Sequence, residues 1–238
     1  MRELDIEEAR ELRRRLDALG DPDAVRAALR EALGLEACLA ERKIVELGEL
    51  PLHIEIYESS PGAPVVLFLP GIGTYVEMYC ELLSGLAHAG LTAVGVDPRG
   101  HGYSGGPRGR YSVREVAKDL STVIDALEPE YGSRPVGLFG CSIGAFLSLA
   151  CAERDERVRA LLCHTLFLTE CPPDLFHLVG WNSVAMTGLL MPYARVSLRT
   201  LVDVDRLLGR NILGQFIEYD DRMVWEYPIC LLYTSDAA

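Results

Sequence analysis

Short apolar runs alternate with amphipathic segments between residues 64 and 163, and this pattern restricts the possible fold more than any other feature. The run at 64–70 is continuously apolar, which is typical of a strand buried on both faces of a parallel sheet. The pattern continues with predicted strands at 91–97, 135–140 and 158–163 and with predicted helices at 75–89, 113–127 and 143–153. Strands that alternate with helices form right-handed crossovers, so we expect a mostly parallel sheet with helices on both faces.

The N-terminal segment has the pattern of helices that precede this region. Leucines at helical spacing predict a surface helix over 3–19. Asp21 followed by Pro22 predicts the start of a second helix, which should end at about Leu33. We interpret residues 1–40 as a helical appendage that packs on the main domain.

Residues 41–165 are expected to form the core domain, which opens with a hairpin of strands at 42–48 and 52–58. Residues 166–224 are apolar and mainly helical in pattern, and they are too many for a simple connection. We interpret them as an inserted helical cap. Residues 225–229 are expected to begin the next strand of the core.

One sequence motif predicts a catalytic function. The segment Gly140-Cys141-Ser142-Ile143-Gly144 matches G-x-S-x-G, with an apolar strand before it and a helix after it, which is the arrangement of a nucleophile elbow. A hydroxyl on such a tight turn projects from the carboxyl edge of the sheet, so Ser142 is the predicted nucleophile. Gly140 and Gly144 are expected where no side chain fits. The backbone N–H of Ile143 is a predicted oxyanion donor, worth roughly 3–4 kcal/mol in the transition state.

With this motif the chain resembles the α/β-hydrolase superfamily, in particular capped serine hydrolases of the monoacylglycerol lipase and lysophospholipase type. The resemblance rests on residues 69–75, residues 97–106 and the elbow, and it covers about residues 50–165. It implies an α/β-hydrolase fold with a cap insertion. It also implies that the loop after the first buried strand supplies a second oxyanion donor, which here is the backbone of Ile72. Pro70 stands where the family usually has histidine.

The resemblance also assigns roles to residues that could be mistaken for catalytic ones. It implies that Asp97, Arg99 and His101 brace loops beside the elbow by hydrogen bonds. Cys141 is interpreted as inert packing under the turn, because the elbow aims the next residue outward.

A serine nucleophile needs a histidine base and an acid that orients it, and this fold places them after the serine in the order acid, histidine. The acid is expected just after the strand that begins near Tyr227, and the histidine in a later loop. His164 and His177 follow Ser142 but are interpreted as packing or surface residues. The triad acid and histidine are therefore not expected in this chain.

Residues 230–238 resemble a translated sequencing adapter, so we expect the natural sequence to be visible only to about Ile229 and the core to lack its C-terminal strands. Asp236 lies in this segment, and for that reason we do not take it as the triad acid. A chain without its base is expected to be nearly inactive.

These observations predict a serine hydrolase that cleaves a carboxylic ester through an acyl-enzyme on Ser142. The apolar cap favours a lipid-like or otherwise hydrophobic acyl ester. Thioester cleavage and peptidase chemistry on the same elbow remain open. The alternative from another class is a non-catalytic α/β-hydrolase-fold protein used for binding or as a scaffold.

Charge and composition limit the kinds of partner and cofactor that we expect for this chain. The net charge of −12 argues against a nucleic-acid partner. The cysteines show no metal-ligand spacing, and no metal or organic cofactor is expected. The N-terminus has no signal-peptide pattern, and no apolar run reaches the length of about 18 residues needed to span a bilayer. We expect a cytoplasmic protein that acts on a small-molecule ester.

Overall fold

The computed structural model describes residues 4–133, 135–165, 187, 191, 194–203 and 216–229. A six-stranded sheet with the order β1-β2-β4-β3-β5-β6 forms its centre. The strands of this sheet are β1 (Arg42–Leu47), β2 (Leu52–Tyr57), β3 (Val65–Leu69), β4 (Thr92–Val96), β5 (Val136–Cys141) and β6 (Val158–His164). β1 and β2 form an antiparallel hairpin that joins β4 in an antiparallel sense, whereas β4, β3, β5 and β6 run parallel. The mostly parallel sheet agrees with the prediction.

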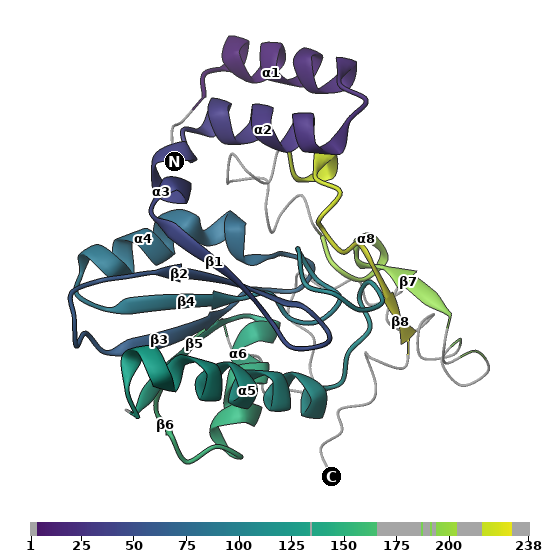
Figure 1. Cartoon of the computed structure of the whole chain (residues 1–238). Coiled ribbons are helices and arrows are strands. Elements are labelled where there is room, and N and C mark those ends of the chain that lie inside the picture. Colours follow the sequence, from purple (N-terminus) through teal and green to yellow (C-terminus); the bar gives the residue numbers. More distant parts are fainter. Residues whose placement is uncertain are drawn as a thin grey trace.

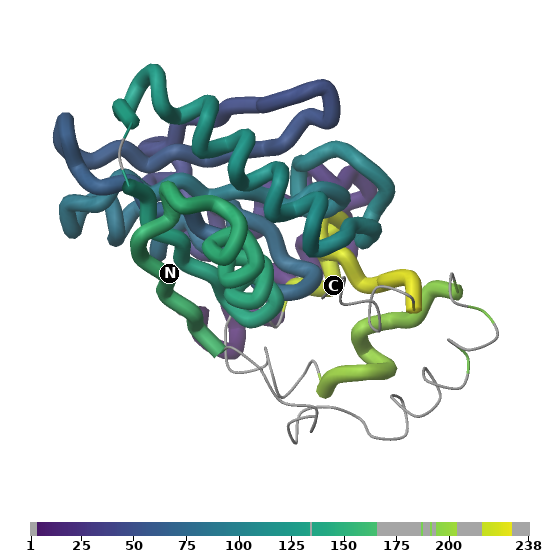
Figure 2. The backbone as a smooth tube through the Cα atoms, turned by 90° about the horizontal axis from the view of Figure 1, so that it is seen from below, coloured from purple at the N-terminus to yellow at the C-terminus, as the bar shows by residue number. Residues whose placement is uncertain are grey.

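Helices cover both faces of this sheet (Figure 1). α4 (Cys80–His88), which follows the short 3-10 helix η1 (Val76–Tyr79), lies on one face. α5 (Val113–Tyr131) and α6 (Ile143–Ala152) lie on the other face and stand in front of the sheet when it is seen from below (Figure 2).

The central strand β3 shows why the apolar run at 64–70 is continuous. Leu67 and Leu69 pack in the cluster under α5 and α6, whereas Phe68 packs in the cluster under α4. All three side chains are fully buried, because successive residues of a strand point to opposite faces and both faces are covered here. The carboxyl end of β3 is therefore held firmly beside that of β5.

Three helices precede the sheet: α1 (Ile6–Ala18), α2 (Pro22–Leu33) and α3 (Glu36–Ala40). The start of α2 is as predicted, with the Asp21 carboxylate accepting the Ala24 N–H at 2.9 Å. α2 ends at Gly34, whose φ of 69° is the left-handed conformation that glycine adopts at low cost. α1 lies on the outer side of α2, away from the sheet (Figure 1). The short helix α3 was not predicted.

The expectation for residues 225–229 needs correction. Strand β8 (Glu226–Pro228) does form, but it pairs antiparallel with β7 (Arg195–Ser197) in a separate two-stranded sheet. The Ile229 N–H also donates to the Ala194 carbonyl, at 2.8 Å. These bonds, together with the burial of Tyr227 at the carboxyl edge of the main sheet, hold β8 over the loops instead of beside β6.

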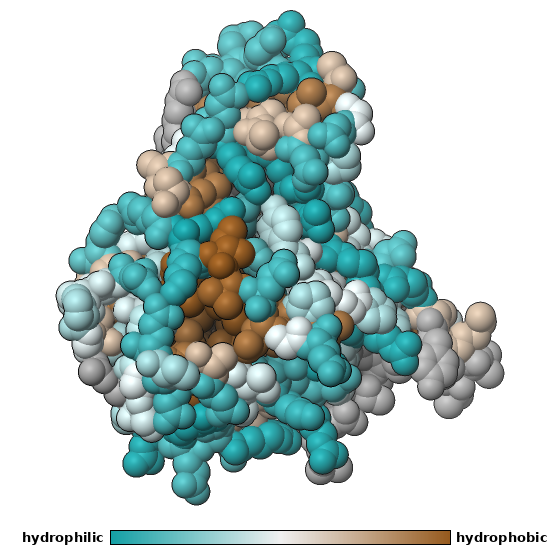
Figure 3. All heavy atoms as spheres, in the orientation of Figure 1, coloured by the Kyte–Doolittle hydropathy of each residue, from teal (hydrophilic) through white to brown (hydrophobic). Residues whose placement is uncertain are grey.

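Two further short elements are α8 (Leu198–Leu201), which packs beside β7, and η2 (Ile217–Tyr219), which lies next to α2 (Figure 1). Most of the predicted cap at 166–224 and all of residues 230–238 lie outside the described residues. None of the helices in the described part is both long and apolar enough to cross a membrane. Apolar side chains gather over the β1–β2 hairpin, where Ile44 is half exposed (Figure 3).

Candidate active site

Ser142 occupies the turn between β5 and α6, and its backbone is in an unusual conformation. Its φ of 55° and ψ of −118° lie in a region that residues with a side chain rarely adopt. The turn is fixed from both sides, because the Ser142 N–H donates to the His164 carbonyl at 2.8 Å and the Ser142 carbonyl accepts the Ala145 N–H at 2.9 Å. Such strain costs of order 1–3 kcal/mol and persists where the surrounding structure enforces it.

The two glycines of the motif lie where no side chain fits. A Cβ on Gly140 would come within 2.2 Å of the Gly144 carbonyl oxygen. A Cβ on Gly144 would come within 2.4 Å of the carbonyl oxygens of both Leu69 and Pro70. The start of α6 is thus in backbone contact with the end of β3, and the loop that follows β3 begins next to Ser142.

That loop runs beside the serine. A Cβ on Gly71 would lie 3.7 Å from the Ser142 Cβ, so the backbones of the two segments face each other. Within the described part of the chain, the N–H groups of Ile72 and Ile143 donate to no acceptor. Ile143 is also the first residue of α6, whose N-terminal end carries positive partial charge. The segments that carry these two N–H groups, the start of α6 and the loop after β3, lie next to each other at Ser142.

Hydrogen bonds from several directions fix this loop. The Gly71 N–H donates to the Tyr79 hydroxyl at 3.3 Å, and the Thr74 hydroxyl donates to the Gly71 carbonyl at 2.8 Å. The Gly73 N–H donates to the Tyr227 hydroxyl at 2.8 Å. Burial raises the pKa of Tyr79 to about 12, so its hydroxyl stays protonated at neutral pH. No sequence motif indicated Tyr79, and Tyr227 reaches this loop across 154 residues, a separation that no local pattern encodes.

The resemblance implied that Asp97, Arg99 and His101 brace loops, and the structure shows Asp97 bonded to the segments on either side of it, Arg99 bonded to helix α5, and His101 bonded to Arg99 and to strand β8. The fully buried Asp97 carboxylate accepts the N–H groups of Val76 at 2.7 Å and Tyr103 at 3.0 Å. Burial raises the pKa of Asp97 to about 7 despite these bonds. Arg99 forms a two-bond ion pair with Asp119 on α5, at 2.7 Å for each bond.

No described histidine is bonded to the Ser142 hydroxyl. The His164 Nδ1 lies 3.1 Å from the Thr165 hydroxyl and 3.6 Å from the Cys141 sulfur. Both ring nitrogens of His101 are used elsewhere, on Arg99 and Tyr227. His177 lies outside the described residues. Burial raises the pKa of Cys141, which supports its interpretation as an unreactive thiol.

A buried ionic cluster joins the N-terminal helices to this region. Arg30 on α2 forms two bonds of 2.7 Å to the carboxylate of Glu77 on η1. Arg42 on β1 reaches both Glu77 and the fully buried Glu55, each at 2.9 Å. Each carboxylate thus has a guanidinium partner, which is the arrangement that makes burial of charge tolerable.

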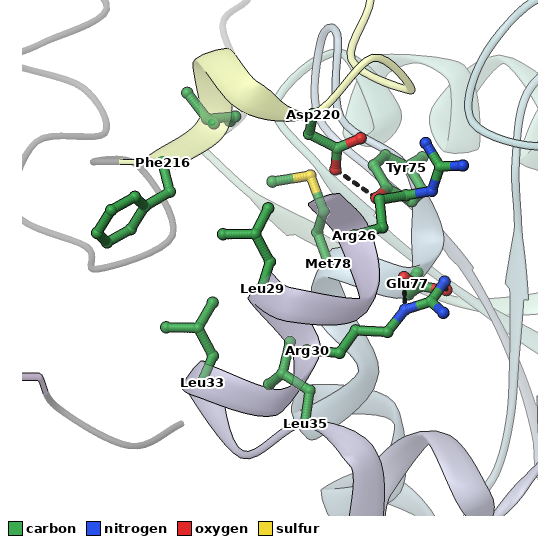
Figure 4. A pocket seen from close by; sticks show the side chains of 11 residues that line it. Arg26, Leu29, Arg30, Leu33, Leu35, Tyr75, Glu77, Met78, Phe216 and Asp220 are labelled. Carbon is green, nitrogen blue, oxygen red and sulfur yellow. Dashed lines mark hydrogen bonds and ion pairs between the residues drawn. The ribbon is translucent and has the colours of Figure 1, made fainter. Parts of the chain in front are cut away.

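Figure 4 shows a small cavity beside this cluster, between α2, η1 and η2. Arg30 and Glu77 lie along one side of it, and the Tyr75 hydroxyl donates to Asp220 nearby. Its volume of about 30 Å³ holds no more than one or two water molecules and excludes an acyl chain. The described residues contain no cluster of His, Cys, Asp or Glu side chains suited to a metal ion.

Residues 60–227 match the family described as serine aminopeptidase, S33, a hydrolase family. The chain belongs to this family. The match spans the loop after β3, the elbow and strand β7, and it ends within β8. It agrees with the predicted membership of the α/β-hydrolase superfamily.

Two curated relatives and one solved structure illustrate what this chain is similar to. The chain is 31% identical over 120 residues to the thiohydrolase apmlB of Arthrinium phaeospermum, covering 49% of this chain and 39% of that protein. It is 30% identical over 131 residues to a thiohydrolase of Eupenicillium brefeldianum, covering 52% and 42%. The monoacylglycerol lipase of Paleococcus ferrophilus superimposes with a TM-score of 0.61 at 24% identity, over 76% of this chain and 66% of that one. This chain therefore spans about two fifths of the length of those curated relatives.

The strained turn at Ser142 predicts a gain in stability when the side chain is removed entirely. Glycine adopts the observed φ and ψ without strain, so Ser142→Gly should raise the free energy of unfolding by about 1 kcal/mol. Ser142→Ala keeps a Cβ and should change it little. Urea denaturation of the two variants measures the difference, and a glycine variant less stable than the alanine variant would show that the turn stores no strain.

Proposed function

We propose that this protein is a serine hydrolase in which Ser142 attacks the carbonyl carbon of a carboxylic ester. The observation that carries the proposal is the strained turn of Ser142 at the start of α6, with the loop after β3 beside it. We assign the oxyanion donors to the backbone N–H groups of Ile143 and Ile72 on these two segments. A hydroxyl at that position can form a bond to a carbonyl carbon whose oxygen points at the two donors. Each such donor is worth roughly 3–4 kcal/mol once the oxygen becomes negative.

The reaction has two halves. In the first, a histidine accepts the Ser142 hydroxyl proton while the serine oxygen bonds to the acyl carbon, and the bond to the leaving alcohol then breaks as that proton passes to it. In the second, the same histidine activates a water molecule that displaces Ser142 and releases the acid. We assign the histidine and its orienting acid to sequence beyond Ile229, because in this fold both follow the strand that begins near Tyr227. In agreement, no described group is bonded to the Ser142 hydroxyl.

The 238-residue chain tested by itself should therefore turn over esters very slowly. An unactivated serine is a weak nucleophile at neutral pH. The protein expressed from its complete gene should be active. Hydrolysis by the 238 residues alone at ordinary enzyme rates would overturn the assignment of the base.

The substrate that we propose first is a hydrophobic acyl ester, in line with the apolar composition of residues 166–224. A thioester is the second candidate, because the two curated relatives are named thiohydrolases. Both substrates pass through the same acyl-enzyme and differ only in the leaving group.

A matched pair of substrates separates these candidates. Oxygen esters and thioesters of one acyl chain, offered to the complete protein, should give the same acyl-enzyme on Ser142. A kcat/KM at least 10-fold higher for the oxygen ester supports the first candidate, and the reverse ratio supports the second. A protein that cleaves neither and takes up no organophosphonate at Ser142 is the non-catalytic binding or scaffold protein.

A further inference from the structure

We propose that Tyr227 and His101 are positioning residues, which hold the loop of the proposed oxyanion hole through a hydrogen-bond chain of fixed direction. The inference rests on the proposed function, because it assigns a role in the alignment of the Ile72 donor. The chain of bonds joins three parts of the sequence: the loop after β4, strand β8 and the loop after β3. Tyr227 is separated from His101 by 126 residues and from Gly73 by 154.

The direction of the bonds follows from the chemistry of the groups. The His101 Nδ1 lies 3.1 Å from the Arg99 carbonyl oxygen, which can only accept, so Nδ1 carries the hydrogen. In a neutral ring Nε2 is then an acceptor, and the Tyr227 hydroxyl, 2.7 Å away, donates to it. The oxygen of that hydroxyl in turn accepts the Gly73 N–H at 2.8 Å.

Burial keeps this direction in place. His101 and Tyr227 are almost completely enclosed, with 3% and 0% of their surface exposed. Burial lowers the pKa of His101 to about 4, so the ring is neutral at pH 7 and Nε2 is free to accept. Burial also raises the pKa of Tyr227, so its hydroxyl keeps the proton that it donates.

Strand β8 and the residues just before it contact the loop after β3 at Gly73. Gly73 has a φ of 75°, and a Cβ there would come within 2.7 Å of the Val224 carbonyl oxygen. The Val224 N–H donates to the Gly73 carbonyl at 2.9 Å. Gly73 is thus held on both sides, by Val224 and by the Tyr227 hydroxyl, and it directly follows Ile72. We expect a shift of Gly73 to displace the backbone of Ile72 and with it the proposed oxyanion donor.

Tyr227→Phe tests the inference, because it removes one oxygen and leaves the ring in place. The matched control is Tyr111→Phe. Tyr111 is also buried and also packs against His101, with ring centroids 5.3 Å apart, but its hydroxyl has no hydrogen-bond partner among the described residues. Both variants remove the phenol oxygen of a buried tyrosine that packs against the same imidazole, and only one of them breaks the chain of hydrogen bonds.

The rates should separate the two variants in the complete protein. With the active fraction titrated by an organophosphonate, Tyr227→Phe should lower kcat per active serine by roughly 10-fold or more and leave KM within about twofold. The rate of phosphonate attachment should fall by a similar factor. Tyr111→Phe should stay within about twofold of the wild type in each quantity. Equal losses in the two variants would overturn the inference.

Hydrogen exchange tests the same chain of hydrogen bonds without a measurement of catalysis. Peptides that contain residues 71–75 should exchange faster in Tyr227→Phe than in Tyr111→Phe, because only the former frees the Gly73 N–H. If the wild type takes up no phosphonate at Ser142, the proposed function fails, and the exchange rates still decide whether Tyr227 holds the loop. Unchanged exchange with an active wild type rejects the inference alone.

A measurement on the unmodified protein covers the case in which Tyr227→Phe does not fold. Nitrogen-15 NMR of the histidine side chains should show His101 as the neutral tautomer with hydrogen on Nδ1 at pH 7. Hydrogen on Nε2, or on both nitrogens, would reverse or break the bond to Tyr227 and overturn the proposed direction.

Discussion

Ser142→Ala should lower the kcat of the complete protein for ester hydrolysis by roughly 1,000-fold or more. The change removes the atom that, in the proposed mechanism, bonds to the acyl carbon, whereas the proposed backbone donors of Ile143 and Ile72 remain. The free energy of unfolding should hardly change, because the alanine Cβ keeps the strained turn. Steady-state kinetics on an ester and urea denaturation measure the two effects.

Ser148→Ala is the matched control for this loss. Ser148 lies on the same helix α6 and is fully buried, and its hydroxyl has no hydrogen-bond partner within the described part of the chain. Its removal should leave kcat/KM within about twofold and should leave stability equal or slightly higher. A Ser142→Ala variant that keeps more than about a tenth of the activity would contradict the role of Ser142.

Gly144→Ala should damage both activity and stability. Its Cβ would meet the carbonyl oxygens of Leu69 and Pro70 at 2.4 Å, and since both neighbours are backbone atoms the helix and strand must move apart. We expect the free energy of unfolding to fall by about 1–3 kcal/mol. We expect kcat/KM to fall by roughly 100-fold, because the loop that carries Ile72 starts at Pro70 and moves away from Ser142.

Gly85→Ala provides the comparison for this change. Gly85 lies within α4, and a Cβ there would meet no atom within 4 Å. Alanine suits a helix better than glycine, so this variant should be more stable by up to about 1 kcal/mol and fully active. If Gly144→Ala behaved in the same way, the close contact between α6 and the end of β3 would have no bearing on function.

The elements that sequence patterns predict correctly are those that depend on local chemistry. The apolar run at 64–70 becomes β3, and Asp21 caps α2 as expected. The G-x-S-x-G spacing predicts a strand, a tight turn and a helix, which are β5, the strained Ser142 and α6. In each case a few neighbouring residues determine the conformation.

Local sequence patterns do not predict which segments pair when they are far apart in the chain. β2 alternates polar and apolar residues, which predicts one solvent-exposed face, yet all of its residues are buried. Arg42 neutralises Glu55 on that face, and the loop that carries Tyr103 covers His53. Likewise, nothing in the segment around Tyr227 indicates that its hydroxyl meets Gly73, so the sequence predicted a core strand where the structure has a bridge to the loop after β3.

The most direct test of the whole account is to treat the complete protein with a fluorophosphonate and map the adduct by peptide mass spectrometry. The proposed function predicts one covalent adduct on Ser142, formed in step with the loss of ester hydrolysis and absent from Ser142→Ala. No adduct, or an adduct on another residue that leaves Ser142 unmodified while activity is lost, would contradict the assignment of Ser142 as the nucleophile.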